Sequence, residues 1–265
     1  MKPNSRIFAV ANQKGGVGKT TTSVNLAASL AATKRKVLLI DMDPQGNATM
    51  GCGIDKLGLE LSACEVLLGD ARLEEAVVPL EDMHFDVLPA NGDLTVAEVK
   101  LVSLFGREFK LKKALEKSPL GYDYVFIDCP PSLNMLTVNA MVAASGVLIP
   151  MQCEYYALEG LTALMRTIED LRDSVNPDLR VEGLLRTMYD PRNNLSNDVS
   201  EQLVEYFGDR VYNTIIPRNI RLAEAPSHGR PVLYYDRASR GALAYLALAG
   251  EILRRETTED KKAVM

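Results

Sequence analysis

Glycine and lysine residues are concentrated in one short segment, residues 13–21, and their spacing predicts phosphate chemistry. Glycines let backbone N–H groups turn toward phosphate oxygens, and a helix expected after them presents its positive N-terminal end. Lys19 can reach β- and γ-phosphates, and Thr20 can ligate Mg²⁺. The strict pattern G-x-x-x-x-G-K-[ST] fails, because its first position is Gln13. The segment that predicts a nucleoside triphosphate site reads Gln13-Lys14-Gly15-Gly16-Val17-Gly18-Lys19-Thr20-Thr21.

Two apolar runs end in aspartate, a residue type that accompanies phosphate-bound magnesium. Residues 37–41 read Val-Leu-Leu-Ile-Asp and residues 125–128 read Val-Phe-Ile-Asp, so Asp41 and Asp128 end expected strands. Asp43 lies two residues beyond the first run. A carboxylate beside Mg²⁺ and phosphate is stabilised as an anion by the metal. The simpler alternative for each aspartate is an N-cap or loop position.

Strand-like apolar runs alternate with helix-like periodicity, the pattern of an α/β protein. We therefore predict a single doubly wound, mostly parallel sheet with helices on both faces and a ligand at the carboxyl ends of the strands. The expected strands are Arg6–Asn12, Val37–Asp41, Phe85–Pro89, Tyr124–Asp128, Gly146–Pro150, Val181–Thr187 and Tyr212–Ile216. The expected helices, with apolar residues at three- and four-residue spacing, are Thr20–Ala32, Leu133–Ala144, Leu158–Val175, Asn197–Phe207 and Ala238–Arg255.

Composition sets independent bounds on the protein. The chain has 265 residues, 47% hydrophobic and 25% charged, which is enough to bury one α/β core. We expect one domain over 1–265 with a disordered tail over 256–265, although two small domains also fit the length. Four cysteines without a C-x-x-C pair and two distant histidines suggest neither a disulfide framework nor a zinc site. The polar start and the absence of a membrane-length apolar run predict a cytoplasmic protein without a signal peptide or a stable membrane anchor.

The charge distribution leaves room for a nucleic-acid partner. The net charge is −5, but residues 180–265 carry thirteen Lys/Arg against twelve Asp/Glu, a balance of +1. Every basic residue between Lys117 and Lys261 is arginine. Compositional drift is one explanation, and the other is that planar guanidinium groups serve bidentate phosphate contact. An acidic protein can still carry a local basic face.

The glycine–lysine segment and the two aspartate segments together resemble the ParA/MinD group of P-loop ATPases. Lys14 with residues 15–21 is similar to the deviant Walker A loop of that group. The other two motifs of the group resemble Asp41-Met42-Asp43-Pro44-Gln45-Gly46-Asn47 and Asp128-Cys129-Pro130-Pro131-Ser132. Cys153–Gly160 and Ile216–Gly229 are similar to the chromosomal ParA, or Soj, branch. The resemblance covers nearly the whole chain and implies an ATPase that uses ATP and Mg²⁺.

This resemblance implies a role for each residue of the nucleotide site. Thr20 and Asp128 would hold Mg²⁺, with Asp128 acting through water, and Asp43 would orient the attacking water. Lys14 would reach across a nucleotide-sandwich homodimer to the partner's phosphates, so that ATP joins the two subunits; an ordinary surface lysine is the alternative. The implied nucleotide contacts are Lys14, Gly15, Gly16, Val17, Gly18, Lys19, Thr20, Thr21 and Asp43, with Pro217 and Asn219 near the adenine ring.

DNA is the partner that the resemblance implies. Arg192 and Arg221 match positions at which short family members contact double-stranded DNA without sequence preference, and Arg218 and Arg186 are their neighbours. Each could instead be a solvated loop arginine. An ATP-bound dimer on the nucleoid, released when a ParB-like centromere-binding protein stimulates a weak ATPase, would serve chromosome or plasmid segregation.

Other functions on this scaffold stay open. A MinD-like membrane ATPase needs a basic amphipathic C-terminal helix, but residues 254–265 alternate between acidic and basic with almost no apolar face. A relative that positions a protein assembly would carry nearly the same motifs. A small-molecule kinase would form ADP only with its substrate, and an iron–sulfur reductase would need a bridging cysteine pair that this sequence does not suggest.

Overall fold

A computed structural model describes residues 5–155 and 157–264, with the side chains of residues 258–264 outside the description. Seven strands form one sheet in the order β3-β4-β2-β5-β1-β6-β7. All neighbouring strands run parallel except β3 and β4, which pair antiparallel. The strands are β1 (Arg6–Val10), β2 (Val37–Asp41), β3 (Val78–Leu80), β4 (Phe85–Leu88), β5 (Tyr124–Asp128), β6 (Gly146–Gln152) and β7 (Arg180–Thr187).

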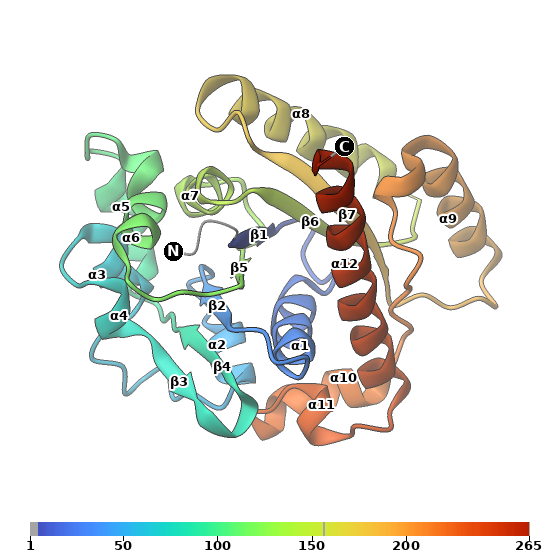
Figure 1. Ribbon diagram of the computed structural model, residues 1–265, viewed down its shortest axis with the longest axis horizontal. Coiled ribbons are helices and arrows are strands. Elements are labelled where there is room, and N and C mark those ends of the chain that lie inside the picture. The colour runs from blue at the N-terminus through green and yellow to red at the C-terminus, as the bar shows by residue number, and fades with distance from the viewer. Residues whose placement is uncertain (1–4, 156, 265) are drawn as a thin grey trace.

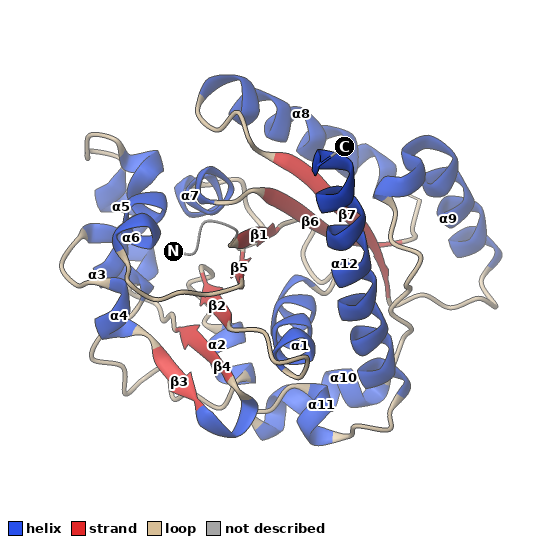
Figure 2. Cartoon of the chain, viewed as in Figure 1, coloured by secondary structure: helices blue, strands red, loops and turns tan. Residues whose placement is uncertain are grey.

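Helices cover both faces of this sheet, as Figures 1 and 2 show. The helices α1, α10, α11 and α12 lie on one face, and α5, α6, α7 and α8 lie on the other. The helices are α1 (Lys19–Ala31), α2 (Asn47–Gly51), α3 (Ala63–Leu68), α4 (Leu73–Ala76), α5 (Leu94–Leu101), α6 (Lys110–Lys117), α7 (Met135–Ala143), α8 (Ala157–Ser174), α9 (Asn194–Phe207), α10 (Ile220–Glu224), α11 (Val232–Tyr235) and α12 (Arg240–Val264). Short 3-10 turns are η1 (Glu81–Met83), η2 (Arg107–Phe109), η3 (Gly208–Arg210) and η4 (Ala225–His228).

The predicted doubly wound, mostly parallel sheet is confirmed, with one wrong strand. The segment expected to form a strand over Tyr212–Ile216 lies beside β7 but forms only isolated bridges, at Val211 and Pro217. Between them, the N–H groups of Asn213 and Thr214 donate to the Glu251 carboxylate at 2.9 and 2.8 Å. A side chain of α12 has therefore taken two backbone donors of the segment, while the N–H groups of Tyr212 and Ile216 donate to β7 carbonyls at 3.0 and 2.9 Å. The short edge strand β3, which contains a proline, was not predicted.

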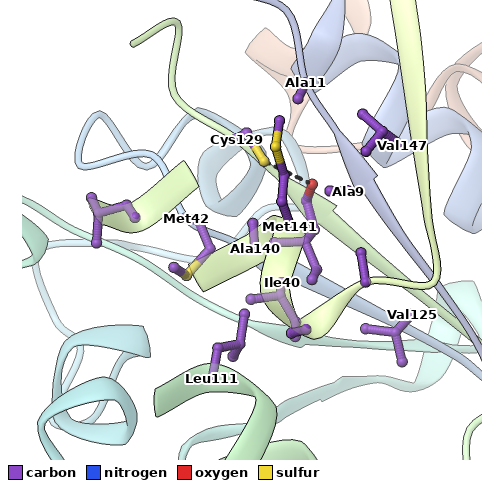
Figure 3. Close-up of a cluster of buried hydrophobic side chains, with 14 of the residues drawn as sticks. Ala9, Ala11, Ile40, Met42, Leu111, Val125, Cys129, Ala140, Met141 and Val147 are labelled. Carbon is purple, nitrogen blue, oxygen red and sulfur yellow. Dashed lines mark hydrogen bonds between the residues drawn. The ribbon is translucent and has the colours of Figure 1, made fainter. Parts of the chain in front are cut away.

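The core consists of two apolar layers that receive alternate side chains of the central strands. In β1, Phe8 and Val10 enter the layer under α1 and α12, whereas Ala9 enters the layer under α7. Figure 3 shows part of the second layer, where Met42 and Cys129 lie near α7. Burial on both faces explains why these strands read as continuous apolar runs.

The register of the sheet brings three strand ends together. Asp41 at the end of β2 pairs directly with Asp128 at the end of β5, and Val10 of β1 pairs with Asp128 from the other side. The carboxyl ends of parallel strands therefore place both aspartates beside the loop that leaves β1.

The last helix, α12, continues to Val264, over most of the region for which the sequence suggested a tail. Glu256 accepts a hydrogen bond from the Tyr124 hydroxyl and pairs with Arg6 at 3.1 Å. Met265 and the side chains after Thr257 lie outside the described residues. Within the described part of the chain, no helix combines the length and the apolarity needed to cross a bilayer.

Gly183 allows the segment 211–217 to lie against β7. A Cβ atom at residue 183 would lie 2.4 Å from Cε2 of the fully buried Tyr212 ring. We expect Gly183→Ala to lower the free energy of unfolding in urea by about 1–3 kcal/mol, because the ring or the strand must shift. Gly160→Ala in α8 is the control, since a Cβ there meets no atom within 4 Å and alanine favours helix. Equal unfolding midpoints for the two variants would contradict this account.

Candidate nucleotide-binding site

The loop between β1 and α1 has the backbone that a phosphate requires. Gly16 and Gly18 adopt left-handed conformations with φ of 73° and 88°, which favour glycine. A Cβ atom at Gly15 or Gly16 would meet no atom within 4 Å, so the space over the loop is open. Gly18 is the N-cap of α1 and provides no side-chain cap. The first N–H groups of α1 are thus left for an anion.

Residues of β6 and β7 hold this loop in place. The Thr187 hydroxyl donates to the Val17 carbonyl at 2.8 Å, and the Gln152 amide donates to the Gly16 carbonyl at 3.3 Å. Val17 is buried beneath the loop. Sequence reasoning missed Thr187 and Gln152, because no local pattern marks a residue whose role is to hold a loop more than 130 positions away.

The two lysines of the loop lie in different environments. Lys19 is buried, and its ammonium donates to the Lys14 carbonyl at 3.0 Å. Burial lowers the pKa of Lys19, while the nearby Asp128 opposes the shift. The Lys14 side chain is 45% exposed, and its ammonium pairs with Glu154 at the start of the β6–α8 connection. Lys19 therefore belongs to the interior of the site and Lys14 to its rim.

Asp128 presents a fully buried carboxylate to the loop. Its Oδ2 accepts a hydrogen bond from the Thr20 hydroxyl at 2.7 Å, and its Oδ1 lies 2.8 Å from Ser23 Oγ. Burial raises the pKa of Asp128, and the neighbouring Asp41 raises it further. A divalent cation would stabilise the charged form, and hydroxyl and carboxylate oxygens suit Mg²⁺. The residues present thus fit the metal, with Thr20 and Asp128 as those that would hold it.

Asp41 has a supporting role instead of a place in the site. It is fully buried, and burial raises the pKa of its carboxyl group. Its oxygens accept hydrogen bonds from the Thr49 N–H at 2.8 Å, the Thr49 hydroxyl at 2.7 Å and the Asp43 N–H at 3.1 Å. Asp41 therefore fixes the backbone from which Asp43 extends. The sequence did not indicate a role for Thr49, because a threonine in a short helix matches no motif.

Pro217 and Asn219 come close to the loop although they lie some two hundred positions away in the sequence. Together with Gly18, Thr21 and other residues they line a cavity of about 170 Å³. The Asn219 side chain also caps α10 by accepting a hydrogen bond from the Arg221 N–H at 3.1 Å. The cavity lies beside the phosphate loop, because Gly18 and Thr21 are among the residues that line it.

The arginines expected to contact DNA fall into two groups. Arg192 and Arg218 lie on neighbouring segments, because the Arg218 N–H donates to the Tyr189 carbonyl at 3.3 Å. The Arg192 side chain is 88% exposed and pairs with Asp190 at 2.8 Å, which lowers the pKa of Asp190 to about 2. Arg218 is exposed and forms no ion pair within the described residues. These two arginines are available to a large ligand.

Arg221 and Arg186 are more restricted. The Arg221 guanidinium pairs with Glu224 at 2.8 Å and with Asp236 at 3.2 Å. Arg186 is buried, and its guanidinium donates to the Ser200 hydroxyl and to the Tyr212 carbonyl, both at 2.8 Å. Arg186, which the sequence placed only as a neighbour of the expected DNA contacts, instead links β7 to α9 and to the segment that follows it.

An open phosphate loop at the switch point of a doubly wound sheet, beside a buried carboxylate, defines a P-loop nucleotide-binding protein. A family model described as "AAA domain" matches residues 5–181. The chromosome partitioning protein ParA of Caulobacter vibrioides is 52% identical over 260 residues, 97% of each chain. The sporulation initiation inhibitor protein Soj of Bacillus subtilis is 52% identical over 247 residues, 93% of this chain and 98% of the relative. The chain belongs to the ParA/MinD family of P-loop ATPases.

A solved structure agrees with this assignment and with the expected cofactors. A Mycobacterium smegmatis protein described as cobyrinic acid a,c-diamide synthase, with bound ADP and magnesium, has a TM-score of 0.84 and 41% identity, and the match covers 96% of both chains. The present protein is an ATPase that uses ATP and Mg²⁺. The metal supplies charge neutralisation for the β- and γ-phosphate oxygens when it is bound.

Thr49 tests whether Asp41 controls the position of Asp43. Its hydroxyl donates to Asp41 and accepts the Ala90 N–H at 2.8 Å, so Thr49→Val leaves the buried Ala90 N–H without its partner and removes one of the three hydrogen bonds to Asp41. We expect this variant to lose about 1–3 kcal/mol of unfolding free energy and to hydrolyse ATP more slowly. Thr49→Ser keeps the hydroxyl and should remain close to the wild type in both denaturant unfolding and phosphate-release assays. A stable, fully active valine variant would show that Asp41 does not need this bond.

Proposed function

We propose that this ATPase segregates DNA through a dimer that forms only with ATP. The observation that carries the proposal is the placement of Lys14 at the rim of the phosphate loop, half exposed, with its ammonium directed to Glu154. Lys19 already supplies the interior cation of the subunit's own loop. A second lysine at the rim is suited to the phosphates of a second subunit.

The interaction energies favour a change of partner for Lys14, from Glu154 of its own subunit to the phosphates bound by a second subunit. An exposed ion pair such as Lys14–Glu154 contributes about 0–1 kcal/mol, because both groups are well solvated. A triphosphate carries several negative charges, and a dimer interface would exclude water from the new contact, which strengthens it. The net gain depends on the γ-phosphate and would be lost after hydrolysis, so that ATP forms the dimer and hydrolysis releases it.

Hydrolysis would use the two aspartates in different ways. Asp43, held by the Asp41–Thr49 bonds, would orient the attacking water, and Asp128 would hold Mg²⁺ through water. Pro217 and Asn219 would contact the base in the adjoining cavity. The rate of the protein alone would be low, and a ParB-like centromere-binding protein would stimulate it.

Duplex DNA is the ligand that we assign to the exposed arginines. Arg192 and Arg218 would contact phosphates without reading bases, with Arg221 as a third contact. Two joined subunits double the number of phosphate contacts, and each contact releases counterions, so affinity rises steeply on dimerisation. The names and similarity of the ParA and Soj relatives support this proposal. The dimer would then coat the nucleoid in the cytoplasm and segregate a chromosome or plasmid.

Lys14→Ala tests the dimer. We expect the variant to bind ATP but to remain monomeric, because each lysine removed from a water-excluded charge pair weakens the interface by more than about 2 kcal/mol. Light scattering with ATP and a non-hydrolysable analogue would measure the mass, and fluorescent nucleotide titration would measure binding. Lys113→Ala, an exposed lysine on α6, is the control and should dimerise normally. An ATP-dependent dimer of the Lys14 variant would refute the proposed role.

DNA binding is tested with unrelated duplex DNA in ATP, ADP and no nucleotide, across a salt series. We expect binding only with ATP, and we expect Arg218→Ala or Arg192→Ala to lower the slope of log affinity against log salt by about 2, since a dimer loses two contacts. Arg221→Ala should have a smaller effect, because its guanidinium is held by two carboxylates. Arg166→Ala, an exposed arginine on α8, is the control.

The same assay separates the proposal from its competitors. ATP-dependent dimers that bind no DNA in any state would indicate a protein that positions another cargo. ADP formation that depends on a small molecule and not on DNA would indicate an enzyme of small-molecule metabolism.

A further inference from the structure

We propose that Ser23 is a positioning residue for the magnesium site, acting through Asp128. The inference rests on the ATPase site and is independent of any DNA partner. Ser23 lies outside the phosphate-loop pattern, three residues beyond Thr20, and nothing in the motif predicts a function for it. The structure places it against the metal-side carboxylate.

The contacts of Ser23 favour a bond to Asp128. Ser23 Oγ lies 2.8 Å from Asp128 Oδ1 and 3.0 Å from the Lys19 carbonyl. A hydroxyl has one proton, so it donates to one of these two acceptors at a time. The carboxylate is the nearer acceptor and carries charge, which makes the bond to it the stronger one.

Helix geometry explains how α1 holds both oxygens of one carboxylate. Residues three apart lie on the same face of a helix, so Thr20 and Ser23 both face the end of β5. The Thr20 hydroxyl bonds Oδ2 and the Ser23 hydroxyl bonds Oδ1, which fixes the plane of the carboxylate. Ser23 and Asp128 are both fully buried. Removal of the serine hydroxyl would therefore take a donor away from a carboxylate that is buried from bulk water.

The two hydroxyls have different tasks in this arrangement. Thr20 is a residue that would ligate Mg²⁺, so its oxygen serves the metal as well as Asp128. Ser23 Oγ lies within hydrogen-bond distance of Asp128 and of the Lys19 carbonyl. Through its bond to Oδ1, Ser23 sets the orientation in which Asp128 meets the magnesium–nucleotide complex.

A second buried serine on α1 shows that a helix serine need not take such a role. Ser29 is 1% exposed, and its Oγ is among the buried atoms without a hydrogen-bond partner in the described structure. The same residue type, on the same helix and equally buried, lacks the contact that Ser23 makes. Ser29→Ala is consequently a matched control for removal of a hydroxyl from α1.

The test titrates Mg²⁺ against binding of a fluorescent ATP analogue, alongside steady-state hydrolysis. Residues that orient a metal ligand typically change metal affinity or activity by about 10–100-fold when removed. We expect Ser23→Ala to raise the Mg²⁺ concentration for half-maximal response by at least about 10-fold and to lower kcat, with a smaller change in KM for ATP at saturating metal. Ser29→Ala should leave all three unchanged, and Ser23→Thr, which keeps the hydroxyl, should restore the response.

The route through Asp128 is tested by a double-mutant cycle. In an Asp128→Asn background, Ser23→Ala should have no further effect on the Mg²⁺ response. The proposal is overturned if Ser23→Ala lowers the melting temperature while the Mg²⁺ response stays normal, or if its effect persists undiminished beside Asp128→Asn. If Ser23→Ala does not fold, the Ser23→Thr variant alone must keep the wild-type Mg²⁺ response.

Discussion

The buried carboxylate of Asp128 is the constraint around which the site is arranged. The sheet register places it opposite Asp41, and burial together with that neighbour disfavours its charge. The protein offsets this cost with the Thr20 and Ser23 hydroxyls and with the nearby ammonium of Lys19. A bound magnesium ion would complete the compensation. Nucleotide binding would thus relieve an electrostatic cost that the fold itself imposes.

The segment 211–219 connects the site to the exposed arginines. Pro217 and Asn219 line the cavity beside the phosphate loop, and Arg218 lies between them in the chain. The segment is anchored to α12 through Glu251 and to β7 through Arg186, so it is held at both sides without being part of the sheet. If the segment moved when a base occupied the cavity, Arg218 would move with it. This continuity is a physical route by which nucleotide state can reach a DNA-contacting surface under the proposed function.

Local sequence patterns predicted the helices, the strands and the phosphate loop. The features that these patterns did not predict depend on contacts between residues far apart in the sequence. The residue types in segment 13–21 are enough to predict phosphate binding. The continuous apolar runs are enough to predict the buried strands. Tyr212–Ile216 also contains large apolar residues, but Glu251, nearly forty positions later, takes the N–H groups of Asn213 and Thr214. Ser23 and Thr49 acquire roles only because β5 and β2 end beside them. The sequence could not show that Arg186 is buried, since a guanidinium is usually exposed and the acceptors of this one are distant.

Two of the arginines that we propose as DNA contacts already form ion pairs within their own subunit. Arg192 and Arg221 both face carboxylates of their own subunit, so binding a phosphate exchanges one anion for another. Such exposed pairs are well solvated and contribute little to stability, so breaking them costs little. The gain comes from counterions that leave the DNA, and it grows with the number of phosphates contacted. A single subunit offers few contacts, whereas two joined subunits offer twice as many on one rigid body. Under the proposed function, a monomer would therefore be a weak DNA ligand because it offers few contacts, and dimerisation, and hence ATP, would decide when binding occurs.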